Sequence, residues 1–311
     1  MPRLTAIEAA RPAGRTRAAT RGWIEWAALL AFPAVVCILR SRVPPWQFMW
    51  LVSFAVFLGC KWQTWFHARE TRARASPWRN LGYLFLWPGM DANAFLDEVS
   101  PGRPELSEWV AGLVRTFAGI ALIALAAWNI DSMPPLLAGW LGIAGLVLFL
   151  LFGTFQLVAL IWQSAGVNAK PIMRAPLVST SLGEFWGKRW NTGFRELTHG
   201  LVFMPTRKRL GPARAAIAAF LVSGLVHDFV ISFPARGGYG LPTAYFLLQG
   251  IGMIFERSAL GKRLGLGHGP RGWLFVLLMT GGLGVFLYHP PFVRRVMLPF
   301  LGAIASMVGW R

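Results

Sequence analysis

The segment from Leu136 to Trp162 contains no charged residue, and it is longer than the roughly 20 apolar residues that a helix needs to span a bilayer. The 311-residue chain as a whole is 55% hydrophobic and 14% charged, and its mean hydropathy is +0.49. A soluble protein is typically about 25% charged. The sequence therefore predicts an all-α, polytopic bundle of transmembrane helices and excludes an ordinary soluble protein.

Hydropathy along the chain predicts about eight spans, with interfacial or re-entrant helices between them. The expected spans are 23–39, 45–66, 109–128, 136–162, 214–234, 240–256, 272–289 and 296–310. Residues 81–96 and 183–205 mix aromatic with charged side chains, a composition typical of helices at the membrane interface. We expect these two segments to line a central chamber that opens toward the cytoplasm. Residues 1–22 are predicted to be a basic cytoplasmic segment, and residues 23–311 a single transmembrane domain.

The net charge of +18 would indicate a nucleic-acid partner in a soluble protein. Here the charges lie almost entirely between apolar segments, so the lipid bilayer and an acidic small molecule are the expected partners, and no nucleic acid is. Lys and Arg concentrate on the loops that share one side with the N-terminus, which predicts cytoplasmic termini by the positive-inside rule. The excess of Arg over Lys hints at a bacterial source, and hence at the bacterial cytoplasmic membrane. No metal-binding or disulfide motif is present.

His227 is the most unusual polar residue, because it lies well inside the predicted span 214–234. An ionisable side chain at that depth usually belongs to a functional site that faces the bundle interior. The alternative is a structural histidine that is hydrogen-bonded to a neighbouring helix. Asp228 points about 100° away around a helix, so it is not an obvious direct partner of the imidazole.

A second feature is the segment from Glu184 to Glu196, which places large aromatics among charges: Phe185-Trp186-Gly187-Lys188-Arg189-Trp190-Asn191, followed by Phe194 and Arg195. An aromatic belt at the membrane interface would explain this composition without any chemistry. The remaining histidines are expected to be structural, since they fall in loops or at span ends: His67, His199, His268 and His289. Asp91 and Glu256 are secondary candidates.

The two features together resemble the paired motifs of the membrane-bound O-acyltransferase superfamily. The run from Phe185 to Asn191, followed by Ser223-Gly224-Leu225-Val226-His227, is similar to the plant-type wax synthase branch in particular. Weaker similarities are Trp87-Pro88-Gly89-Met90-Asp91 and Tyr245-Phe246-Leu247-Leu248-Gln249-Gly250. The resemblance is firmest over about 180–257, which would be the motif-bearing core of an acyltransferase domain.

The resemblance implies an enzyme that transfers a fatty acyl group from acyl-CoA to the hydroxyl of a lipophilic alcohol. His227 would match the catalytic histidine of the family and Asn191 its motif asparagine. A neutral imidazole can remove the proton of an attacking alcohol, and Asn191 could orient that imidazole or donate to the developing oxyanion. Acyl-CoA would be a co-substrate, and no other cofactor is implied.

Substrate binding is expected at five residues of the aromatic and basic segment, namely Trp186, Lys188, Arg189, Trp190 and Arg195. Arg is suited to bidentate contacts with the phosphates of coenzyme A. The competing explanation for such cations is the positive-inside rule, which we favour for Arg207-Lys208-Arg209. The rival function is a transporter or permease with His227 as a proton-relay residue. That function calls for further ionisable residues at mid-membrane, and only Lys61 and Arg115 approach this description.

Overall fold

The computed structural model describes residues 14–98 and 102–310, with side chains from Trp26 onward. Within these residues the chain is helical and contains no β-strand, which confirms the predicted all-α class. Residues 1–13 of the predicted basic segment lie outside the described residues, and residues 14–22 belong to the first helix.

The α-helices in chain order are α1 (Gly14–Cys37), α2 (Pro45–His67), α3 (Arg69–Arg74), α4 (Pro77–Leu86), α5 (Ala92–Leu96), α6 (Leu106–Trp128), α7 (Pro135–Val147), α8 (Phe155–Ser164), α9 (Leu182–Glu184), α10 (Thr192–Thr198), α11 (Met204–His227), α12 (Phe233–Ala235), α13 (Leu241–Arg257), α14 (Ala259–Arg263), α15 (Gly269–Leu277), α16 (Gly284–Leu287), α17 (Pro290–Phe292) and α18 (Leu298–Met307). Short 3₁₀ and π-helical turns are η1 (Leu148–Thr154), η2 (Pro176–Val178), η3 (Phe185–Arg189), η4 (His199–Phe203), η5 (Asp228–Ser232), η6 (Leu278–Gly282) and η7 (Val293–Met297).

Four continuous helical segments of the described chain are long and apolar enough to cross a membrane: Leu106–Trp128, Pro135–Ser164, Thr192–Ala235 and Gly269–Leu287. The first three contain the predicted spans 109–128, 136–162 and 214–234, and the fourth overlaps the predicted span 272–289 as far as Leu287. The other four predicted spans fold as α1, α2, α13 and η7 with α18. Among the described side chains, which in α1 begin at Trp26, none of these four helices combines the required length and hydropathy. The chain is thus an all-α integral membrane protein, and the count of eight stays a prediction.

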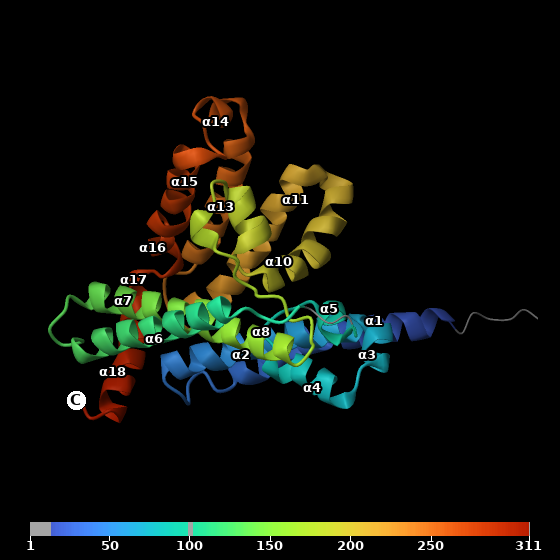
Figure 1. Ribbon diagram of the computed structural model, residues 1–311, viewed down its shortest axis with the longest axis horizontal. Coiled ribbons are helices and arrows are strands. Elements are labelled where there is room, and N and C mark those ends of the chain that lie inside the picture. The colour runs from blue at the N-terminus through green and yellow to red at the C-terminus, as the bar shows by residue number, and fades with distance from the viewer. Residues whose placement is uncertain (1–13, 99–101, 311) are drawn as a thin grey trace, which may run out of the picture.

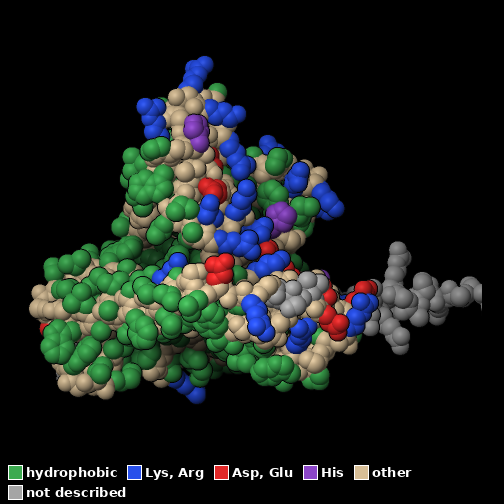
Figure 2. Space-filling model, in the orientation of Figure 1, with side chains coloured by type: hydrophobic (Ala, Val, Ile, Leu, Met, Phe, Trp, Pro, Cys, Tyr) green, Lys and Arg blue, Asp and Glu red, His purple; other side chains and the backbone are tan. Residues whose placement is uncertain are grey.

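The helices form two parts (Figure 1). Helices α2, α6, α7 and α8 lie alongside one another in the lower part, and α11, α13 and α15 make up most of the upper part. Hydrophobic side chains cover much of the lower part, whereas Lys and Arg gather on the upper part (Figure 2). Several large apolar side chains of α6 are more than half exposed, for example Phe117 at 65% and Trp128 at 65%. Such a surface is suited to lipid rather than water.

Small residues bring the lower helices close together, as is common for helices in lipid. A Cβ atom on Gly119 of α6 would overlap the backbone of Phe149 in η1. A Cβ atom on Gly145 of α7 would lie 2.9 Å from the carbonyl oxygen of Gly119. The backbones of α6 and of the α7–η1 helix therefore touch directly.

The segment 81–96 is folded into the protein as α4, α5 and the turn between them. Tyr83 and Phe95 are fully buried, and Phe95 packs edge-on against Trp162 of α8 with ring centroids 5.0 Å apart. Lys61 of α2 is also fully buried; its Nζ donates to the carbonyl oxygen of Gly89 at 2.6 Å and lies 3.2 Å from the ring centroid of Tyr83. Lys61 therefore holds the turn of this segment in place.

Candidate active site

His227 is the last residue of α11, and a hydrogen bond at Nδ1 orients its ring. Its Nδ1 lies 2.7 Å from the carbonyl oxygen of Ser223, one turn earlier. Because a carbonyl oxygen can only accept, Nδ1 carries the hydrogen and Nε2 keeps its lone pair. The ring packs on Phe246 of α13, with centroids 4.3 Å apart. This tautomer is the one that a general base at Nε2 requires.

Gly224 allows α13 to approach α11 just before His227. A Cβ atom there would lie 2.6 Å from the Cα atom of Thr243, which is backbone and cannot rotate away. Gly224, within the Ser223–His227 motif, therefore permits the close helix packing that brings Phe246 against the imidazole.

We expect Gly224→Ala to lower the free energy of unfolding by about 1–3 kcal/mol, since the added methyl group must push the two helices apart. Gly281→Ala is the matched control, because the only atom near its added Cβ is Leu277 Cδ1 at 3.9 Å. Thermal denaturation of the purified protein in detergent measures both variants. Equal midpoints for the two variants would contradict the close approach.

Asn191 begins α10 in a left-handed conformation, with φ at 39°. Its Oδ1 accepts a hydrogen bond from the backbone N–H of Phe194 at 3.4 Å, so the side chain caps the helix. A left-handed residue outside glycine is most often asparagine or aspartate, which explains the residue type locally. No hydrogen bond joins Asn191 to His227 in the described part of the chain, and none engages the Asn191 amide N–H₂ group.

Aromatic rings connect the Asn191 segment to the helix pair that holds His227. Trp190 packs against Trp186 at 6.4 Å, and Trp186 packs against Phe246 at 5.6 Å between centroids. The indole N–H of Trp186 donates to Gln249 Oε1 at 3.2 Å, and Gln249 Nε2 donates to the carbonyl oxygen of Met279 at 2.6 Å. The structure thus brings Trp186, Trp190 and His227 into one aromatic cluster. Gln249 and Phe246 join it, although the sequence offered only a weak motif for them.

The predicted phosphate-binding arginines have protein partners. Arg189 forms an ion pair with Glu184 at 2.7 Å and also donates to the carbonyl oxygen of Arg174 at 3.2 Å. The backbone N–H of Thr180 and then Arg189 lower the pKa of Glu184, despite the opposing effect of burial. Arg195 pairs with Glu196 at 3.0 Å. The structure therefore gives both arginines local roles, and their part in substrate binding stays a prediction.

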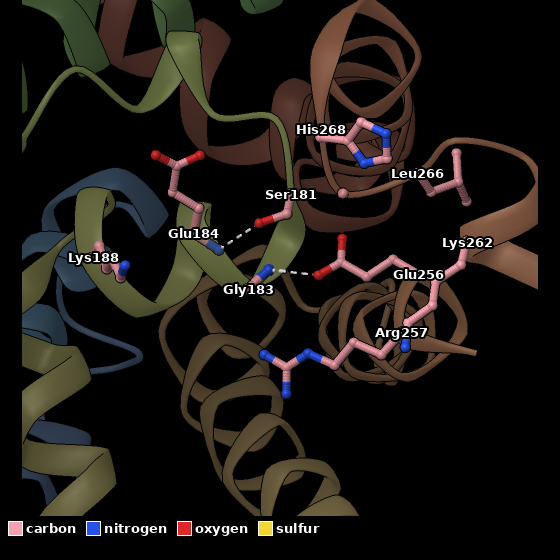
Figure 3. A pocket seen from close by; sticks show the side chains of 10 residues that line it. Ser181, Gly183, Glu184, Lys188, Glu256, Arg257, Lys262, Leu266 and His268 are labelled. Atoms are coloured by element: carbon pink, nitrogen blue, oxygen red, sulfur yellow. Dashed lines mark hydrogen bonds between the residues drawn. The ribbon is translucent and has the colours of Figure 1, made fainter. Parts of the chain in front are cut away.

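A cavity of about 460 Å³ lies beside the aromatic segment (Figure 3). Its lining comes from the start of the segment, from the end of α13, and from α14 and the turn after it: Ser181, Gly183, Glu184, Lys188, Glu256, Arg257, Lys262, Leu266, Gly267 and His268. His227 and Asn191 do not line it. The cavity is lined by part of the segment 183–205 and by no residue of 81–96, so it is not the predicted central chamber, which stays a prediction.

The carboxylates of this cavity are already bonded. Glu256 is buried, and its two oxygens accept the backbone N–H groups of Leu182 at 2.7 Å and Gly183 at 2.9 Å, which caps α9. Glu184 is held by Thr180 and Arg189.

The side chains of three lining cations make no hydrogen bond or ion pair with any described residue, namely Lys188, Arg257 and Lys262. The lining charges that make no hydrogen bond or ion pair with a described residue are therefore positive. Arg257, Lys262 and His268 were not predicted as site residues, because their sequence position only indicated a cytoplasmic loop.

The described residues contain no cluster of three or more His, Cys, Asp or Glu side chains that could hold a metal ion. Cys60 is buried in α2 and Cys37 is partly buried in α1.

Known proteins resemble the chain in the region of these motifs. Residues 169–248 match the Membrane bound O-acyl transferase family. A "Probable long-chain-alcohol O-fatty-acyltransferase 3" of Arabidopsis thaliana is 34% identical over 112 residues, which are 33% of this chain and 33% of that protein. The "Long-chain-alcohol O-fatty-acyltransferase" of Simmondsia chinensis is 31% identical over 145 residues, 42% of this chain and 40% of that protein. The matched region thus spans less than half of each of these relatives, and it confirms the resemblance predicted from the motifs.

Proposed function

We propose that this chain is an O-acyltransferase of the wax synthase-like branch of the membrane-bound O-acyltransferases, which the match over residues 169–248 and the two relatives support. It transfers a fatty acyl group to the hydroxyl of a lipophilic alcohol, which the names of its relatives support, and we propose acyl-CoA as the donor on the resemblance of its motifs. The observation that carries this proposal is the hydrogen bond between His227 Nδ1 and the Ser223 carbonyl oxygen. This bond leaves Nε2 as a proton acceptor within an apolar, aromatic site.

The reaction needs one base and no net proton exchange. Nε2 of His227 accepts the hydroxyl proton while the alcohol oxygen attacks the thioester carbonyl carbon. The tetrahedral intermediate collapses, the C–S bond breaks, and the imidazolium returns the proton to the sulfur of coenzyme A. The products are an ester and the free thiol, and His227 is neutral again.

The direct test is to incubate purified protein with labelled acyl-CoA and a panel of long-chain, branched and sterol alcohols. We expect labelled ester with at least one lipophilic alcohol. Acylation of none of these alcohols would defeat the proposal, and an acyl-enzyme that survives denaturation would replace direct transfer by a covalent mechanism.

The cavity next to Lys188 is our candidate for the phosphate-bearing head of acyl-CoA. Its carboxylates are occupied by backbone N–H groups and by Arg189, whereas the side chains of Lys188, Arg257 and Lys262 make no hydrogen bond or ion pair with a described residue. Charge-assisted hydrogen bonds to phosphate are among the stronger polar contacts. Among the predicted binding residues, Lys188 therefore receives support from the cavity.

We expect Arg257→Ala to raise the KM for acyl-CoA about tenfold, since one charge-assisted hydrogen bond contributes about 1.5 kcal/mol. The KM for the alcohol is expected to stay the same. Lys208→Ala removes the same charge from an exposed position outside the cavity, so it is the matched control. Steady-state kinetics with each substrate varied in turn measures both variants. If the KM for acyl-CoA rises equally in Arg257→Ala and Lys208→Ala, only the general surface charge matters.

We further propose that the chain crosses the membrane about eight times in a bacterial cytoplasmic membrane, with both termini in the cytoplasm. The support is the distribution of Lys and Arg along the sequence. On this proposal α1, α2, α13 and the η7–α18 helix complete the four longer apolar helices. The cavity then opens on the cytoplasmic side, where acyl-CoA is available.

A further inference from the structure

We propose that Asp228, Thr243, Ser232 and His289 form a positioning network that sets the orientation of His227 for catalysis. The inference rests on the proposed function, because it assigns these residues to the reaction of His227. None of the four residues was a predicted site residue, and His289 was expected to be structural.

Asp228 is the centre of this network. Its Oδ1 accepts the hydroxyl of Ser232 at 2.8 Å and the backbone N–H of Gly240 at 2.8 Å. Its Oδ2 accepts the backbone N–H of Thr243 at 3.1 Å and also the Thr243 hydroxyl. Four donors occupy the four lone-pair positions of a carboxylate. Asp228 therefore ties the residue directly after His227 to the beginning of α13.

His289 supplies the second half of the network from a distant part of the chain. It is fully buried at the start of α17, and its Nδ1 accepts the backbone N–H of Phe292 at 3.2 Å. Nε2 must then carry the hydrogen, and it lies 3.1 Å from Ser232 Oγ. The Ser232 hydroxyl donates to Asp228, so the order of donation is His289, Ser232, Asp228.

The network is placed to hold His227 and not to carry protons away from it. Acyl transfer moves the alcohol proton to the departing thiol, so no proton has to leave the site. The four hydrogen bonds of Asp228 do not include His227, whose Nδ1 is bonded to Ser223.

The link to the reacting ring runs through α13. Phe246 follows Thr243 by nearly one helical turn, and its ring packs on His227. If the bonds from Asp228 to Thr243 are weakened, α13 can move away from η5. Phe246 then no longer confines the imidazole, and Nε2 loses its fixed direction. Misplacement of a reacting group by about 1 Å can lower a rate about 100-fold.

The pair Thr243→Val and Thr243→Ser tests the network with little change in volume. Valine removes the hydroxyl that Asp228 accepts, and serine keeps it. We expect Thr243→Val to lower kcat at least tenfold while both KM values stay within about twofold, the pattern of an interaction needed in the transition state. Thr243→Ser should regain most of the lost kcat. Thr116→Val, on α6, is the control, because it removes a hydroxyl that donates to the carbonyl oxygen of Gly112 in its own helix.

A wild-type kcat in Thr243→Val would overturn the proposal, as would a Thr243→Ser variant as slow as Thr243→Val. If kcat falls in parallel with the thermal denaturation midpoint across all three variants, the role of Thr243 is merely structural. That result also overturns the proposal.

A second measurement does not depend on activity. The chain has five histidines, so ¹⁵N spectra of histidine-labelled protein in lipid can be assigned with single substitutions. We expect the Nδ1–H tautomer at His227 and the Nε2–H tautomer at His289, and a mixture at His227 in Thr243→Val. If these tautomers appear but no alcohol is acylated, the proposed function fails and the network stands. If ester forms but the His227 tautomer is the same in Thr243→Val, the network fails.

Discussion

His227→Ala is expected to lower the rate of ester formation by about 10²–10⁴-fold, the usual contribution of a general base. The imidazole is the only ring in the aromatic cluster with a titratable nitrogen, and its Nδ1 is held by the Ser223 carbonyl oxygen. An alcohol without a base is a poor nucleophile near neutral pH. The single-turnover rate with labelled acyl-CoA and a saturating alcohol measures the effect on the chemical step.

His199→Ala is the matched control for this substitution. His199 is exposed and stacks on Phe203 of its own helical turn, at 5.1 Å between centroids, and no ring contact joins it to the His227 cluster within the described part of the chain. We expect the rate of ester formation by His199→Ala to stay within about twofold of the wild-type rate, as for most surface substitutions. If His227→Ala forms ester as fast as the wild type, another group is the base.

Asn191→Gly is expected to lower kcat by about 10²-fold, in the range measured for the loss of one oxyanion donor. The side-chain oxygen of Asn191 caps α10, but its N–H₂ group makes no hydrogen bond to a described residue and remains available to substrate. Glycine accepts φ of 39° without strain and weakens a helix cap by only a few tenths of a kcal/mol. The substitution therefore removes the donor with little effect on folding, and kcat together with the denaturation midpoint separates the two roles.

Ala175→Gly is the control, because Ala175 also has a positive φ, of 46°, and supplies no side-chain donor. We expect it to retain wild-type kcat. An Asn191→Gly variant with full activity would limit Asn191 to capping α10. That result would leave the oxyanion without a protein donor from this segment.

Hydropathy was sufficient to locate four segments that are long and apolar enough to cross a membrane, because a long uncharged apolar run is more stable in lipid than in water. Helix α13 (Leu241–Arg257) nearly coincides with the predicted span 240–256, and α18 continues η7, but neither is among the four long apolar segments of the described chain. The role of cations was also hard to predict. Arg189 and Lys188 are neighbours in the sequence, yet Arg189 pairs with Glu184, whereas Lys188 lines the cavity beside Arg257.

The sequence alone determined the membrane class, the position of His227 inside a span, and the resemblance of its two motifs to acyltransferases. These properties depend on composition and on residues close together in the chain, and a buried ionisable residue stands out in any apolar segment. Only the tertiary structure decided that Phe246 confines His227 and that His289 reaches Asp228 through Ser232. Hydrogen bonds between residues dozens of positions apart depend on helix packing, and no local pattern specifies that packing.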